Sequence, residues 1–234
     1  MTVFLSRFSI LSLLFPPKCP VCRERREKNQ ALCPKCLSEY QKEKHRPCKR
    51  CGKKSCRCAC TPPADPSCAF TYLSVFHYDE KSPGGRMLLK LKDKKSPQIT
   101  AFLAKDMANS LQNGCILRSD ALVTFAPRSP DAVLDKGTDQ AQELSRALAD
   151  LCALEQACTL KNLGGKRQKT LSAKQRLQNA NARFALSKSC PDLQGRQVIL
   201  IDDILTSGAT LSVCAQILKS KGAAQIVCLT AGRR

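Results

Sequence analysis

The chain has 234 residues, 43% of them apolar, and a net charge of +20. That length allows one full domain and a small satellite, and the apolar share is sufficient for a hydrophobic core. Residues 1–68 and 69–234 carry +10 each, which excludes a single basic tail as the source of the charge. The charge favours polyanions such as nucleic acid, acidic membranes or phosphorylated metabolites, without choosing among them.

The N-terminal segment has apolar side chains at helical spacing, namely Phe4, Phe8, Leu11 and Phe15. The spacing predicts a short amphipathic helix that packs on its neighbour. The segment is too short to cross a bilayer and has no small-residue cleavage site. A membrane-surface anchor is the alternative, and it is disfavoured because such helices usually have a more basic polar face. We therefore expect no membrane span and a cytoplasmic protein.

Ten of the 16 cysteines precede residue 69, and three CxxC pairs lie among them. A CxxC turn can point two thiolates at one metal ion, and two such turns complete a tetrahedral zinc site. We expect a first zinc ion on Cys19, Cys22, Cys33 and Cys36. We expect a second on Cys48 and Cys51 with two of Cys56, Cys58 and Cys60. Our prediction is Cys58 and Cys60, although the spacing leaves that choice open, together with a cross-braced arrangement.

A disulfide scaffold is the alternative for this segment, and it would require an oxidising compartment and a signal peptide that the sequence does not show. Residues 16–60 hold few apolar side chains, so zinc is expected to replace a core there. The segment is basic, but Tyr40 is the only aromatic residue between Phe15 and Phe70. Any contact with nucleic acid should therefore involve phosphates rather than stacked bases.

From residue 69 onward, strand-like and helix-like patterns alternate. We predict strands over residues 69–78, 120–127, 197–201 and 224–231. We predict helices over residues 84–112 with a break at Pro97, and over 138–153, 171–184 and 210–222. Leu144, Leu148 and Leu151 should share one buried helix face. The alternation indicates an α/β fold with a parallel sheet covered on both faces.

The change of pattern predicts two domains, a helix and cysteine-rich ribbon over residues 1–68 and an α/β domain over residues 69–234. The cysteines of the second domain have no ligand spacing. We expect them to be buried small apolar residues. They are Cys115, Cys152, Cys158, Cys190, Cys214 and Cys228.

The segment VILIDDILTSGATL, residues 198–211, joins a buried strand to two aspartates and a turn of small, hydroxyl-bearing residues. Gly208 gives the backbone freedom to converge its N–H groups, and a helix is predicted to begin near Thr210. A phosphate monoester fits such a helix N-terminus. Asp202 and Asp203 would repel that phosphate unless they face sugar hydroxyls, with or without a magnesium ion. A ribose 5-phosphate offers both groups, so the segment predicts a phosphosugar site.

This segment resembles the phosphoribosyl-pyrophosphate (PRPP) motif of type I phosphoribosyltransferases. The whole chain resembles the ComF competence-protein family, in which a zinc ribbon precedes a phosphoribosyltransferase domain. KGTDQA at 136–141 resembles a segment that usually reads RGFNQA, and QKTLSAKQRLQNANARF at 168–184 resembles a Q..L....R..N....F signature. The matching positions are Gly137, Gln140, Gln168, Leu171, Arg176, Asn179 and Phe184.

The resemblance implies binding of PRPP with magnesium. It assigns the ribose hydroxyls to Asp202 and Asp203. It assigns the 5-phosphate to Thr206, Ser207, Gly208, Ala209 and Thr210. By analogy, residues 126–128 would form the pyrophosphate loop, and the further PRPP contacts would be Arg128, Lys136, Gln140 and Arg176. A loop with Lys166, Arg167 and Lys169 could close over the site.

The chain also departs from the family pattern. Lys136 stands in place of Arg, Thr138 in place of Phe and Asp139 in place of Asn. Asp131 and Asp135 occupy a loop that is usually basic, which weakens the case for pyrophosphate handling. Purine-salvage relatives place an acid at the position of Thr206, so a purine acceptor is disfavoured.

Two functions remain. The ComF resemblance implies a role in natural competence, with single-stranded DNA on the basic surface and a regulatory or vestigial PRPP pocket. Its expected partners are a competence helicase and other uptake or recombination proteins. The alternative is an active phosphoribosyltransferase that transfers phosphoribose from PRPP to an unidentified acceptor in nucleotide metabolism. The altered RGFNQ segment favours the first function.

Overall fold

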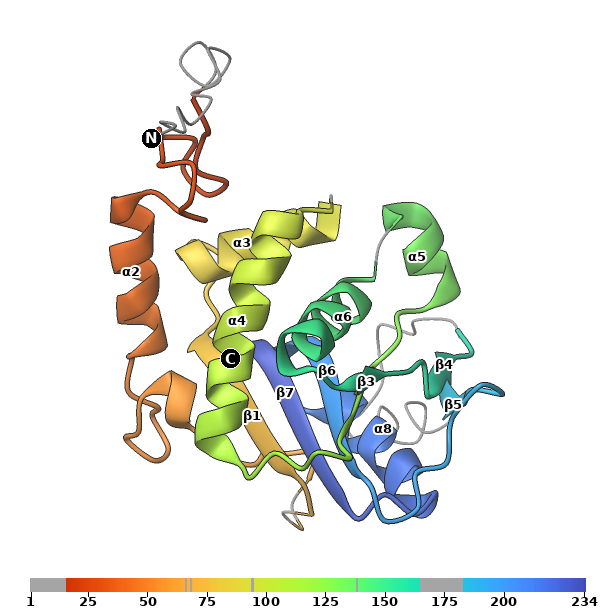
Figure 1. Cartoon of the computed structure of the whole chain (residues 1–234). Helices are drawn as coiled ribbons and strands as arrows, with labels where there is room; N and C mark the ends of the chain where they lie inside the picture. Colours follow the sequence, from red (N-terminus) through yellow and green to blue (C-terminus); the bar gives the residue numbers. More distant parts are fainter. Residues whose placement is uncertain (1–15, 66, 68, 94, 138, 165–182) are drawn as a thin grey trace, which may run out of the picture.

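The computed structural model of the chain describes residues 16–65, 67, 69–93, 95–137, 139–164 and 183–234. Within these residues, five parallel strands form a sheet in the order β1-β7-β6-β2-β3 (Figure 1). The strands are β1 (Thr71–His77), β7 (Gln225–Arg233), β6 (Gln197–Leu205), β2 (Leu122–Phe125) and β3 (Glu155–Gln156). A separate antiparallel pair consists of β4 (Leu160–Asn162) and β5 (Phe184–Leu186).

The two faces of the sheet bury alternate residues of the same strand. In β6, Ile199 and Ile201 pack into one hydrophobic cluster, and Val198 and Leu200 pack into a second. Successive side chains of a strand point to opposite faces, so a sheet covered on both sides needs a nearly continuous apolar run. The predicted α/β fold with a parallel sheet is confirmed.

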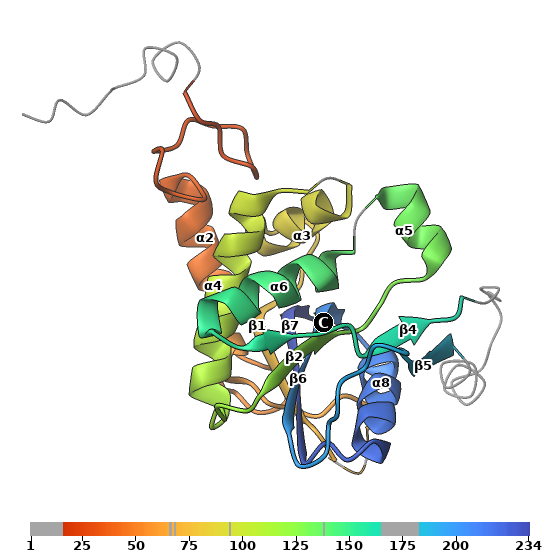
Figure 2. The ribbon, with the colours of Figure 1, turned by 45° about the vertical axis from the view of Figure 1, so that its right-hand side comes forward.

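Helices cover both faces of the sheet (Figures 1 and 2). Side chains of α3, α4 and α6 belong to the first hydrophobic cluster, and those of α8 to the second. The bounds are α3 (Pro83–Asp93), α4 (Pro97–Gly114), α5 (Pro130–Lys136), α6 (Gln140–Cys152) and α8 (Ala209–Ser220). The predicted break is confirmed, since Pro97 opens α4, where a missing backbone N–H is tolerated.

The predicted burial of Leu151 is wrong. Leu144 and Leu148 are fully buried, but Leu151 is 56% exposed. At the end of α6, Cys152 and Leu154 pack against the hydrophobic cluster instead. Helical periodicity alone cannot predict this, because it does not show which side of the last turn meets the body of the protein.

The isolated cysteines were predicted to be buried, and this is correct only for Cys214 and Cys228. Cys158 is exposed, because it lies in the connection that leaves the sheet after the edge strand β3. The remaining three are partly buried, namely Cys115, Cys152 and Cys190.

Some predictions fall outside the described residues: the N-terminal helix up to Phe15, and most of the helix at 171–184. The loop residues Lys166, Arg167 and Lys169 and the candidate ligand Arg176 lie there as well. Within the described ranges, the structure has no helix that is both long and apolar enough to span a membrane.

The ribbon shares a hydrophobic core with the sheet. Its helix α2 (Pro34–Lys44) lies beside α3 and α4 (Figure 1). Tyr40 of α2 is fully buried, with its ring centroid 5.6 Å from that of Phe76 and 5.3 Å from that of Phe102. The sequence led us to expect that zinc replaces a core in the ribbon. The structure instead shows an apolar contact at Tyr40, which zinc would supplement. The predicted domain boundary at residue 68 remains a prediction, and this packing makes the two parts interdependent.

A buried carboxyl group of α2 also joins the two parts. Glu43 is 8% exposed, and its Oε1 accepts a hydrogen bond from Ser82 Oγ at 2.6 Å. Its Oε2 accepts from the backbone N–H of Gly84 at 3.0 Å, in the first turn of α3. Burial raises the pKa of Glu43 to about 7, against the lowering effect of these two hydrogen bonds. The folded protein thus binds this proton more tightly than the unfolded chain does.

We expect Glu43→Gln to stabilise the protein at pH 8 and to have little effect near pH 5. The ordinary pKa is 4.5 and the folded value about 7, so the contribution of Glu43 to stability falls as the pH rises through this window and is constant above it. Removing the buried charge should stabilise by roughly 1–3 kcal/mol at pH 8. Thermal unfolding of both proteins between pH 5 and 8.5 measures the difference. A difference that does not change with pH would contradict the shifted titration.

Candidate functional site

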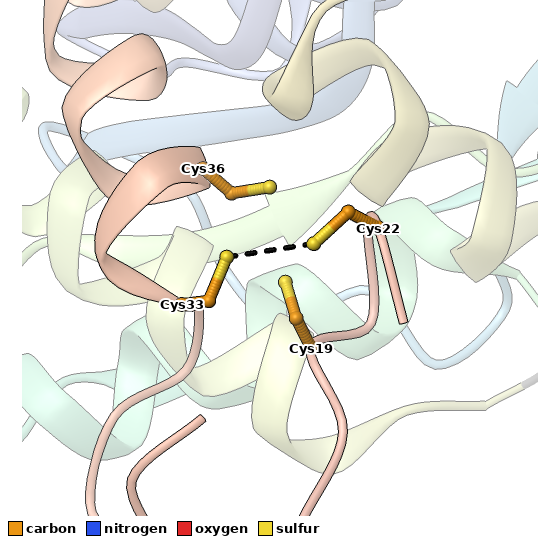
Figure 3. A group of neighbouring side chains, drawn as sticks. All are labelled: Cys19, Cys22, Cys33 and Cys36. Carbon is orange, nitrogen blue, oxygen red and sulfur yellow. Dashed lines mark hydrogen bonds between the residues drawn. The ribbon is translucent and has the colours of Figure 1, made fainter. Parts of the chain in front are cut away.

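Four cysteines of the ribbon converge on one point (Figure 3). Cys19 and Cys22 come from a turn, while Cys33 caps α2 and Cys36 lies in its first turn. Their sulfur atoms all lie within 4.8 Å of one another, and the Sγ atoms of Cys22 and Cys33 are 3.4 Å apart. Four sulfurs at about 2.3 Å from a tetrahedral zinc ion are roughly 3.8 Å apart. The donor set and its spacing therefore fit a zinc ion.

A second group of four sulfurs lies within the same limit of 4.8 Å and consists of Cys48, Cys51, Cys58 and Cys60. Two of its members precede the short 3-10 helix η1 (Ser55–Arg57) in the chain and two follow it. Cys56 is not part of the group. The clusters follow one another along the chain, so the geometry is sequential rather than cross-braced.

Backbone amides favour the thiolate form at both clusters. Burial raises the pKa of Cys48, but the N–H groups of Arg50 and Cys51 outweigh it and lower the pKa to about 6. Burial likewise opposes the N–H groups beside Cys19, which lower its pKa to about 7. Zinc binds the thiolate rather than the thiol, so these turns prepare one ligand in each cluster for the metal. Burial raises the pKa of four other cluster members, namely Cys22, Cys36, Cys58 and Cys60.

The phosphate loop, residues 206–210, joins β6 to α8. The strand β6 continues to Leu205, four residues further than predicted, so both aspartates lie within it. Gly208 caps α8 with φ of +80°, a conformation that glycine adopts without strain. A pocket of about 40 Å³ is lined by this loop and by Asp202. The first amides of a helix have no intrahelical partner, so they are available to an anion there.

The two aspartates have different neighbours in the structure. Asp202 lines the pocket of the phosphate loop, and its Oδ1 accepts a hydrogen bond from the N–H of Asp203 at 2.8 Å. Burial raises the pKa of Asp202, and the charge of Asp203 adds to the rise. Oδ2 of Asp203 lies 3.9 Å from Lys92 Nζ and 3.8 Å from Arg128 Nη2. One carboxyl group therefore faces the phosphate loop and the other faces two cations.

Arg128 follows β2 and is held in place by α6. Its backbone N–H donates to Oδ2 of Asp139 at 2.9 Å. The other oxygen of Asp139 caps α6 by accepting from the N–H groups of Ala141 at 3.1 Å and Gln142 at 3.4 Å. A carboxylate offers two acceptor oxygens where the asparagine of the family pattern offers one. This departure from the family therefore has a structural use, since it ties the predicted pyrophosphate loop to a helix.

Among the other predicted PRPP ligands, Gln140 is not in the lining of the phosphate-loop pocket. Gln140 is 2% exposed, and its Nε2 donates to the backbone oxygen of Leu88 in α3 at 3.5 Å. Lys136 is the last residue of α5, and Arg176 is outside the described residues. Lys92 was missed by the sequence analysis, because nothing in the basic run at 90–95 distinguishes it from its neighbours.

Two family models match the chain, a double zinc ribbon domain over residues 10–70 and a phosphoribosyl transferase domain over residues 132–234. The chain thus matches a double zinc ribbon followed by a phosphoribosyl transferase domain. The combination is consistent with the ComF family, so the resemblance seen in the sequence is confirmed. Zinc is the cofactor that the ribbon and its two cysteine clusters support.

Relatives that are similar to this chain in sequence include the DNA utilization protein YhgH of Escherichia coli K12. It is 26% identical over 221 residues, which cover 90% of this chain and 88% of that protein. YhgH of Salmonella typhimurium is 27% identical over the same length. Competence protein F of Haemophilus influenzae is 39% identical over 59 residues, 25% of this chain and 26% of its own length.

Solved structures that match part of this chain include the glutamine PRPP amidotransferase of B. subtilis. It has a TM-score of 0.36 and 16% identity over 56% of this chain and 25% of that chain. A hypoxanthine phosphoribosyltransferase from Staphylococcus aureus has a TM-score of 0.37 and 12% identity over 61% of this chain and 69% of its own. The assignment rests on the family models and not on these two structures.

Proposed function

We propose that the chain binds PRPP with magnesium at the carboxyl end of β6 and handles single-stranded DNA in natural competence. The observation that supports the proposal most is the pocket that Asp202 shares with the phosphate loop, within a phosphoribosyl transferase domain. Ligands of parallel sheets bind at the carboxyl ends of strands. A ribose 5-phosphate would offer its hydroxyls to the carboxyl group and its phosphate to the loop.

In this proposal each side of the site has a separate role. The phosphate loop binds the 5-phosphate through backbone amides and the hydroxyls of Thr206, Ser207 and Thr210. Asp202 and Asp203 accept hydrogen bonds from the ribose hydroxyls. The cations Lys92 and Arg128, close to Asp203, stabilise the negative charge of the pyrophosphate.

Two kinds of metal ion belong to the proposal. Magnesium commonly uses one or two carboxylates together with phosphate oxygens of the ligand, and it would neutralise charge on the pyrophosphate. Asp202 and Asp203 are the residues that would hold it. The zinc ions would be held by the two cysteine clusters, Cys19, Cys22, Cys33 and Cys36 and then Cys48, Cys51, Cys58 and Cys60.

The alternative is an active phosphoribosyltransferase in nucleotide metabolism. The convergence of Lys92 and Arg128 on Asp203 favours it, because two cations could stabilise pyrophosphate as a leaving group. The two functions differ in one measurable product, since only the enzyme releases pyrophosphate. Release that depends on an added acceptor would select the enzyme.

Calorimetric titration of the zinc-loaded protein with PRPP and magnesium tests the proposed ligand. Ribose 5-phosphate and pyrophosphate, titrated separately, show which half of PRPP supplies the affinity. We expect PRPP to bind and magnesium to strengthen the binding. The proposal of a PRPP site fails if neither PRPP nor ribose 5-phosphate binds the folded protein.

The DNA part of the proposal is supported by the net charge of +20 and by the relatives. Their names refer to DNA utilization and to competence. We therefore propose a cytoplasmic protein that works with a competence helicase and other uptake or recombination proteins. The exposed lysines of the ribbon, among them Lys53 and Lys54, are suited to phosphate contacts.

We expect single-stranded DNA binding to weaken about 100-fold when salt rises from roughly 50 to 200 mM, as for about five phosphate contacts. Lys53→Gln with Lys54→Gln should weaken binding and reduce the slope of log K against log salt by roughly 0.7 per lost contact. Fluorescence anisotropy with a labelled oligonucleotide measures both. The matched control is Lys161→Gln with Lys188→Gln, two exposed lysines outside the ribbon. If the slope of log K against log salt is the same for Lys53→Gln with Lys54→Gln as for the control variant, the ribbon is excluded as the DNA surface.

A further inference from the structure

Arg233, near the end of β7, is bonded to the second cysteine cluster. The side chain is 9% exposed, and its Nη1 donates to Sγ of Cys58 at 3.1 Å and to the backbone oxygen of Cys58 at 3.3 Å. Its Nη2 donates to the backbone oxygen of Cys60 at 2.7 Å. A planar guanidinium with several donors suits this multiple contact, and its charge offsets the excess negative charge of a four-thiolate zinc site.

The same arginine lies beside the start of the phosphate loop. Arg233 is paired with Leu205 in the parallel ladder between β7 and β6. The backbone N–H of Arg234 then donates to the oxygen of Leu205 at 3.0 Å. Leu205 directly precedes the first residue of the phosphate loop. A displacement of Arg233 would therefore be passed to this loop through a backbone hydrogen bond.

A second connection leads from the cluster to the loop along the chain. After the ligand Cys60, residues 61–65 run against the phosphate loop. The N–H of Ala64 donates to the oxygen of Ser207 at 3.2 Å, and Ser212 Oγ of α8 donates to the oxygen of Ala64 at the same distance. Gly208 is so close to Pro62 that a Cβ at position 208 would overlap the proline ring.

We propose that the second zinc cluster positions the phosphate loop, with Arg233 and the segment 61–65 as its two connections. Arg233 is thus a positioning residue, and occupancy of the second zinc site is linked to phosphosugar binding. The linkage with the ligand rests on the proposed PRPP site, whereas the ordering of the loop does not. Because linkage is reciprocal, a phosphosugar in the pocket should slow the loss of zinc from the second cluster.

Hydrogen exchange of the ligand-free protein tests the positioning role. We expect the amides of residues 206–210 to exchange roughly tenfold faster in Arg233→Gln than in the wild type. The matched control is Arg234→Gln, which removes the same charge from an exposed side chain paired with Glu80. Unchanged exchange in folded Arg233→Gln would overturn the proposal. If Arg233 only balanced charge, its substitution would alter zinc affinity and leave the exchange of the loop amides unchanged.

Two further measurements keep the test decisive if Arg233→Gln does not fold. Cys51→Ser removes an exposed ligand of the second cluster, and its loop amides should also exchange faster. In the wild type, ribose 5-phosphate should slow zinc transfer from this cluster to a chelator roughly tenfold, with the first cluster unaffected. If PRPP and ribose 5-phosphate do not bind at all, the proposed function fails, but the exchange data still decide the positioning role. Normal loop exchange in Cys51→Ser would refute it.

Discussion

Cys36→Ser is expected to release one of two zinc ions and to lower the melting temperature of the whole chain by at least about 10 °C. Cys36 lies in the first turn of α2 and is 3% exposed. A structural zinc ion contributes on the order of 10 kcal/mol to folding, which is comparable with the total stability of a typical domain. Without zinc, α2 loses the anchor of its first turn, and Tyr40 loses its fixed position between Phe76 and Phe102.

Zinc content by mass spectrometry and thermal unfolding measure this effect together. Cys56→Ser is the control inside the ribbon, because Cys56 lies outside both clusters. It should keep two zinc ions and a melting temperature close to that of the wild type. A loss of zinc in Cys56→Ser, or two retained zinc ions in Cys36→Ser, would disprove the ligand assignment.

The double substitution Asp202→Asn with Asp203→Asn is expected to reduce PRPP affinity roughly 100-fold or more and to leave the fold intact. Hydrogen bonds to charged groups contribute about 1.5–3 kcal/mol each, so the loss of two carboxylates reaches this magnitude. The fold should survive, because Asn at 202 keeps the acceptor for the N–H of Asp203. The double substitution also removes the repulsion between two neighbouring carboxylates. This gain in stability offsets the loss of the long ion pairs that Asp203 forms with Lys92 and Arg128.

The control for this variant is Asp120→Asn with Glu155→Gln. Both residues are exposed, lie toward the amino ends of β2 and β3, and pair with arginines at the surface. The control changes the net charge by the same amount, at the opposite end of the strands from the phosphate loop. Calorimetry should show normal PRPP binding in the control. Equal weakening in both variants would mean that overall charge, and not the aspartate pair, governs affinity.

The local part of this molecule could be read from the sequence. The run VILI, the helix break at Pro97 and the cysteine spacing each depend on a few neighbouring residues, and all three predicted features are present in the structure. The phosphate loop is equally local, since a strand, a glycine with positive φ and a helix start follow one another directly. The apolar pattern of the sequence predicted the ends of helices and strands less reliably than their middles. Leu151 and the last four residues of β6 show this, because tertiary packing decides where a helix face or a strand pairing stops.

The contacts between distant segments could not be predicted. Arg233 bonds Cys58 across 175 positions of the sequence, and Tyr40 of α2 packs against Phe76 of β1 and Phe102 of α4. Among the 39 lysines and arginines, no local pattern marks Lys92 or Arg233 as special. Sequence spacing determined the metal clusters and the phosphate loop, since their residues are neighbours along the chain. The connection between them arises only when the sheet forms and brings β7 beside β6, because side chains so far apart meet through packing and not through local geometry.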